Sequence, residues 1–103
     1  MIAQVREQQD AISTLCKQFK VVRLELFGSA ARCDDINQVN DIDVLASFAE
    51  GADLGPWLGR FSEFREALEA LFAKPVDVVM DGSHLKTRFR EAIQADRHVI
   101  YAY

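Results

Sequence analysis

The sequence predicts an α/β or α+β layer architecture, in which a small sheet of three to four strands is flanked by helices. The 103 residues leave room for one domain with one core, spanning residues 1–103. Short apolar, β-branched runs alternate with longer stretches in which apolar residues recur every three or four positions. No repeat, linker or low-complexity segment divides the chain.

The first half of the chain contains the patterns of two helices and two strands. Apolar spacing across residues 2–19 predicts an amphipathic helix. The apolar run Val21–Phe27 predicts a buried strand, and Ser29–Arg32 a short helix. After polar residues 34–40, the alternating stretch Asp41–Phe48 predicts a second strand.

The second half continues the alternation of helix and strand. After a loop at Glu50–Gly55, aromatic and aliphatic residues repeat at helical spacing up to residue 72, with Pro56 in the first turn. Lys74-Pro75 ends this helix, and Val76–Met80 predicts a third strand. Residues 83–93 predict a last helix, and the tail, residues 99–103, is either an edge strand or packs on the core.

Composition narrows the class of protein. The formal net charge is −4 and no Lys/Arg cluster is present, which argues against direct binding of nucleic acid. Cys16 and Cys33 have neither metal-ligand spacing nor a disulfide framework, and no signal or membrane-spanning run is found. We therefore expect a cytoplasmic protein that does not contact membranes. The 50% hydrophobic content leaves apolar surface for a partner subunit or a homo-oligomer.

Gly28, Ser29, Asp41 and Asp43 form the most informative motif. A Gly-Ser turn leaves one apolar strand, and about a dozen residues later two aspartates stand one residue apart on the next. Residues i and i+2 of a strand share a face, so the carboxylates would lie side by side, as needed to bind divalent cations. The turn can present backbone N–H groups to a phosphate. The simpler alternatives are a structural turn and a solvent-facing edge strand.

Asp77 adds a third carboxylate to this group. It interrupts the apolar run PVDVV, where an unpaired charge would be costly to bury. If the third strand lies next to the second, Asp77 completes a three-carboxylate cluster. The alternative is a surface position on an edge strand.

These residues form one ordered pattern: G-S-x-A-R, then D-x-D, then an Asp in a Pro-Val-Asp strand. The pattern resembles the minimal nucleotidyltransferases of the polymerase-beta superfamily. The resemblance implies a polymerase-beta-like nucleotidyltransferase fold and transfer of a nucleotide with Mg²⁺. It implies that Asp41, Asp43 and Asp77 are catalytic ligands of two ions, and that Gly28, Ser29 and Arg32 bind ATP. For Arg32, a structural salt bridge is the alternative.

Small proteins of this type resemble the antitoxin half of toxin–antitoxin pairs. The resemblance implies a HEPN-type helical ribonuclease toxin as partner, with AMP transferred from ATP to one of its tyrosines. Cys33 and Asn40 stand where the family usually has Gly and Ser. They favour an alternative in which the chain neutralises its partner by binding alone. A third possibility, an enzyme acting on a small molecule, usually requires an acceptor-binding domain.

Overall fold

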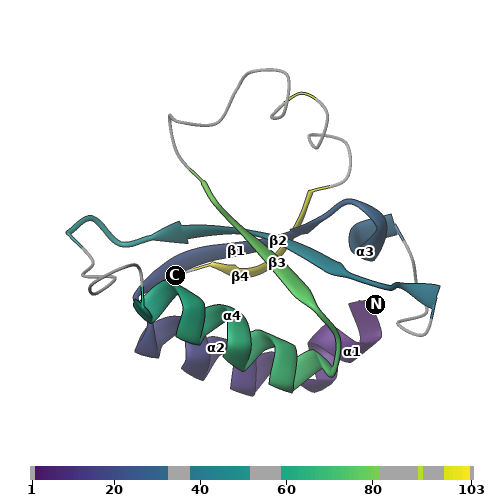
Figure 1. Cartoon of the computed structure of the whole chain (residues 1–103), viewed down its shortest axis with the longest axis horizontal. Helices are drawn as coiled ribbons and strands as arrows, with labels where there is room; N and C mark the ends of the chain where they lie inside the picture. Colours follow the sequence, from purple (N-terminus) through teal and green to yellow (C-terminus); the bar gives the residue numbers. More distant parts are fainter. Residues whose placement is uncertain (1, 33–37, 52–58, 82–90, 92–96, 103) are drawn as a thin grey trace.

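The protein is a four-stranded mixed sheet with its longer helices packed on one face (Figure 1). A computed structural model describes residues 2–32, 38–51, 59–81, 91 and 97–102. The predicted architecture, a small mixed sheet flanked by helices, is confirmed, with four strands. The elements are α1 (Ile2–Glu7), α2 (Gln9–Gln18), β1 (Val21–Phe27), α3 (Ser29–Arg32), β2 (Ile42–Phe48), α4 (Gly59–Phe72), β3 (Val76–Met80) and β4 (His98–Ala102).

The strand order is β3-β2-β1-β4. β1 pairs antiparallel with both β2 and β4, whereas β2 and β3 are parallel and are connected through α4. This topology brings the last residue of β1, Phe27, to the same end of the sheet as the first residues of β2 and β3, Ile42 and Val76. We call this the carboxylate end, because the predicted acidic residues lie there.

The main core lies between the sheet and helices α2 and α4. Side chains alternate along β2, so that Val44 and Ala46 face this core while Leu45 packs with Phe27 on the other face. The core includes Cys16, which is fully buried, and burial raises the pKa of its thiol to about 12. Its thiol is therefore protonated at neutral pH.

The N-terminal segment is two helices rather than the predicted one. Gln8 interrupts the helical geometry with φ −106° and ψ 14°. Its side-chain Nε2 donates a hydrogen bond of 2.9 Å to the Leu71 carbonyl of α4. The break therefore coincides with a contact between segments distant in the sequence, which local periodicity cannot reveal.

The tail forms an edge strand, which was one of the two predicted possibilities. Among the described strands β4 pairs with β1 alone, and Ile100 and Tyr101 are buried. Gln9 Nε2 donates a hydrogen bond of 3.0 Å to the carbonyl of Ile100, the residue of β4 that the register irregularity with β1 leaves without a partner in the pairing. Of the predicted last helix the structure describes only Glu91, which is helical, and Pro56 lies outside the described residues. Among the helices that the structure does describe, none has the length and apolar character needed to cross a membrane.

Candidate active site

Asp43 and Asp77 are neighbours across the parallel strands β2 and β3. They are direct register partners, so both side chains project from the sheet face opposite α2 and α4. Asp43 is partly buried and Asp77 is exposed. The condition placed on Asp77, that its strand should lie beside the second strand, is therefore met.

Asp41 lies one residue before β2, not within the strand as predicted. The pKa of the Asp43 carboxyl is nevertheless raised first by burial, then by the negative charge of Asp77 and then by that of Asp41. Both neighbours thus lie close enough to repel a charge on Asp43. Within the described residues, no three His, Cys, Asp or Glu side chains converge as the ligands of one metal ion. The three aspartates form a looser group of like charges.

Gly28 brings the end of β1 against this group. Its φ of +67° lies in the left-handed region, which favours glycine. A Cβ built on Gly28 would lie only 2.8 Å from Asp43 Oδ2, closer than real Cβ atoms approach other atoms. The backbone conformation therefore favours glycine here, and any larger residue would also make the Asp43 carboxylate shift.

We expect Gly28→Ala to destabilise the fold by the roughly 1–2 kcal/mol of a left-handed alanine plus a smaller cost for turning the Asp43 carboxylate aside. Gly51→Ala is the matched control, since Gly51 has φ +77° but no atom within 4 Å of a built Cβ. Urea unfolding of both variants measures the difference. Equal losses of stability, or the same excess in an Asp43→Ala background, would show that the carboxylate does not press on Gly28.

The remaining predicted residues lie on the elements beside this turn. Ser29 opens α3 and Arg32 ends it, both exposed, while Ala30 between them is buried and anchors the helix. Asn40 is exposed directly before Asp41. Cys33 lies outside the described residues. The structure thus brings Gly28 against Asp43 and places Ser29 and Arg32 on the adjoining one-turn helix.

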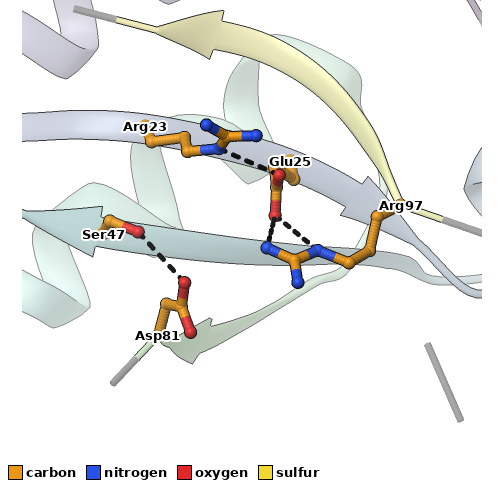
Figure 2. Close-up of polar contacts among 5 residues, drawn as sticks. All are labelled: Arg23, Glu25, Ser47, Asp81 and Arg97. Atoms are coloured by element: carbon orange, nitrogen blue, oxygen red, sulfur yellow. Dashed lines mark hydrogen bonds and ion pairs between the residues drawn. The ribbon is translucent and has the colours of Figure 1, made fainter. Parts of the chain in front are cut away.

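A buried ion-pair network on the same sheet face was not predicted. Glu25 precedes Phe27, the register partner of Asp43, by two residues, so Glu25 and Asp43 share a face. Figure 2 shows the Glu25 carboxylate between two guanidinium groups. Arg23 Nε donates to Oε1 at 2.9 Å, and Arg97 Nη2 donates to Oε2 at 2.6 Å.

Glu25 is the one charged side chain among the described residues that is buried, with 3% of it exposed. A glutamate inside the apolar run VVRLELF was a signal of the same kind that identified Asp77. The partner Arg97, 72 residues further along, could not be assigned from the sequence. At the far end of β2, Ser47 Oγ donates a hydrogen bond of 3.4 Å to Asp81 Oδ2 (Figure 2).

Comparison with known proteins gives matches over nearly the whole chain. The profile of the family described as "Nucleotidyltransferase domain" matches residues 9–102. A solved structure assigned as a minimal nucleotidyltransferase is 31% identical, with a TM-score of 0.68, over 90% of this chain and 89% of its own. No curated protein matches this chain.

Two further solved structures share the fold at lower identity. One is a complex of a tri-AMPylated HEPN toxin from Shewanella oneidensis with an MNT antitoxin, 19% identical with a TM-score of 0.63, over 96% of this chain and 73% of the other. The other is a toxin–antitoxin complex with AMP-PNP, 20% identical with a TM-score of 0.65, over 92% and 73%.

Proposed function

Because this chain belongs to the nucleotidyltransferase domain family, we propose that it transfers AMP from ATP to a tyrosine of a HEPN-type toxin. In this proposal it acts as the antitoxin of a two-gene pair in the cytoplasm. The observation that carries the proposal is the position of Asp43. It is the register partner of Asp77, and its carboxylate lies beside Gly28. The AMPylated HEPN toxin and the AMP-PNP complex, both structures of relatives in fold, support the choice of acceptor and nucleotide.

The donor set of the site fits Mg²⁺. Asp41, Asp43 and Asp77 offer carboxylate oxygens, which Mg²⁺ prefers. Burial raises the pKa of Asp43 most, and the negative charges of Asp77 and Asp41 raise it further. A cation among the three carboxylates would offset their mutual repulsion. These three aspartates would hold two ions. Bound Mg²⁺ would neutralise charge on the phosphates and ease loss of the proton from the acceptor hydroxyl.

The chain's other residues would hold the nucleotide. The Gly28-Ser29 turn can donate backbone N–H groups and a hydroxyl to the triphosphate, and Arg32 supplies positive charge on the same short helix. The acceptor oxygen would form a bond to the α-phosphorus while the bond between the α- and β-phosphates breaks, releasing pyrophosphate. A tyrosine hydroxyl has a pKa of about 10 and must lose its proton on the way.

Neutralisation by binding alone is the second candidate function. Asn40, exposed beside Asp41, replaces the serine that the family usually has there, and Cys33 replaces a glycine. In that case the aspartates would be dispensable for protection against the toxin. An enzyme acting on a small molecule has no observation in its favour among the described residues.

The test is transfer of label from ATP to the co-expressed partner protein. ATP radiolabelled at the α-phosphorus should leave label on a tyrosine of the toxin, whereas ATP labelled at the γ-phosphorus should leave none. Mass spectrometry identifies the modified residue, and EDTA should abolish both the labelling and the binding of ATP measured by calorimetry. Label from the γ-phosphorus, or undiminished labelling in EDTA, would contradict the proposal.

A further inference from the structure

A hollow of about 410 Å³ lies at the end of the sheet away from the carboxylates. It opens where β1 begins and where β2 and β4 end, the end at which Figure 1 places the C-terminus, while α3 lies at the other. Its volume is within the range of sites that bind small ligands or single side chains. The lining is mainly apolar, with two lysines, and consists of Lys17, Lys20, Val21, Val22, Ala49 and Tyr101.

The two lysines give this hollow a positive rim in a chain whose net charge is −4. Lys17 lies in the last turn of α2 and Lys20 two residues beyond that helix, and both are exposed. The Lys20 carbonyl accepts a hydrogen bond of 2.8 Å from the backbone N–H of Ala49, another residue that lines the hollow. The residues that line the hollow thus offer two positive charges to an anionic group, beside the apolar surface of Val21, Val22 and Ala49.

Lys20 also occupies an unfavourable backbone position. Its φ of 61° is left-handed, where glycine is favoured. Ala73, which follows α4, has the same feature with φ 57° but does not line the hollow. Comparing variants of Lys20 and Ala73 therefore separates the effect of the lysine side chain from the effect of the left-handed backbone.

We propose that this hollow docks an acidic segment of the protein acceptor, with an apolar side chain in the hollow and a carboxylate beside Lys17 and Lys20. The identity of the acceptor rests on the proposed function. Gly28 lies seven residues beyond Val21, which lines the hollow, a distance of about 23 Å along an extended strand. A segment docked here leaves the carboxylate end open and raises the effective concentration of the acceptor near it.

The first test uses a peptide probe and needs no transfer. Acetyl-Glu-Leu-Phe-Glu-amide, titrated into the ¹⁵N-labelled protein, should shift the amide signals of Val21, Val22 and Ala49. Lys17→Gln should weaken its binding about two- to five-fold, as expected for one exposed ion pair. The proposal is overturned if the shifts lie elsewhere, or if acetyl-Lys-Leu-Phe-Lys-amide binds equally well.

The second test separates docking from a purely structural role of Lys20. Lys20→Gly should raise the melting temperature by about 2–5 °C, because glycine relieves the left-handed backbone, and yet weaken binding of the probe two- to five-fold. Ala73→Gly should raise the melting temperature similarly and leave binding unchanged. Equal affinities of the two variants would mean that Lys20 serves only the end of the helix and would overturn the proposal.

Labelling of the toxin then tells the two proposals apart. Lys17→Glu combined with Lys20→Glu should raise the KM for the toxin and leave ATP binding as in wild type. Unchanged labelling in this double variant would overturn docking while transfer stands. Peptide binding at the hollow without any labelling of the toxin by wild type would leave the docking site intact and refute the transfer.

Discussion

We expect Asp43→Asn to reduce AMP transfer by about 10³-fold or more while the fold is retained. Asp43 is the aspartate on which the charges of both Asp41 and Asp77 act, and its carboxylate lies beside Gly28. An amide at this position offers neither the charge nor the ligand geometry that a metal-dependent transfer requires. Initial rates with α-labelled ATP measure the loss. Asp81→Asn, on the residue that follows β3, is the matched control and should transfer at nearly the wild-type rate.

The same variant should be more stable than wild type at neutral pH when no divalent cation is present. The folded-state pKa of Asp43 is raised, so folding is penalised once pH exceeds the pKa of the unfolded state, and fully penalised above the folded one. Asparagine removes this penalty above about pH 4 and changes little below it. Urea unfolding of both proteins, measured as a function of pH, checks the sign of this difference in stability. Adding Mg²⁺ should stabilise wild type more than Asp43→Asn.

Cell protection then decides between catalysis and binding. If Asp41→Asn combined with Asp43→Asn protects cells from the toxin as well as wild type does, the chain works by binding. A parallel loss of protection and of labelling would instead support transfer as its mode of action.

The second large effect is on stability. Glu25→Gln should destabilise the protein by about 1.5–3 kcal/mol, because the hydrogen bonds from Arg23 and Arg97 then end on a neutral group in place of the buried carboxylate. For a domain of this size the melting temperature should fall by at least about 6 °C. Circular dichroism melts measure the change.

The two arginines provide graded controls for Glu25. Arg97 is 25% exposed and Arg23 is 51% exposed, so Arg97→Gln should be clearly destabilising, whereas Arg23→Gln should cost at most about 1 kcal/mol. Equal effects of the two arginine variants would contradict a larger contribution from the less exposed Arg97. Combining Glu25→Leu with Arg97→Met should recover part of the loss, since paired apolar side chains need no counter-charge.

Much of the fold followed from local patterns in the sequence. The run Val21–Phe27 is β1 because β-branched and apolar residues favour a buried strand, and Val76–Met80 is β3 for the same reason. The acidic residues were conspicuous because each interrupts or adjoins such a run. Strand adjacency was a condition on Asp77 rather than a prediction, since the sequence does not state which strands pair.

The features that local sequence patterns did not predict depend on contacts between distant segments. The break at Gln8 accompanies a hydrogen bond to Leu71, 63 residues away. Glu25 was detectable as a charge in an apolar strand, but its partner Arg97 reaches it only because β4 lies beside β1. The start of β2 at Ile42 leaves Asp41 outside the strand, so its proximity to Asp43 depends on the tertiary structure and not on strand alternation alone.

The burial of Cys16 gives the protein an internal reporter of its own opening. A thiol with no exposed surface and a pKa raised to about 12 is neither accessible nor ionised, so a thiol reagent meets it only when α2 separates from the sheet. In a Cys33→Ser background this is the single thiol of the chain. Its rate of alkylation therefore measures how often the core opens under native conditions, without denaturant and without a label built into the protein.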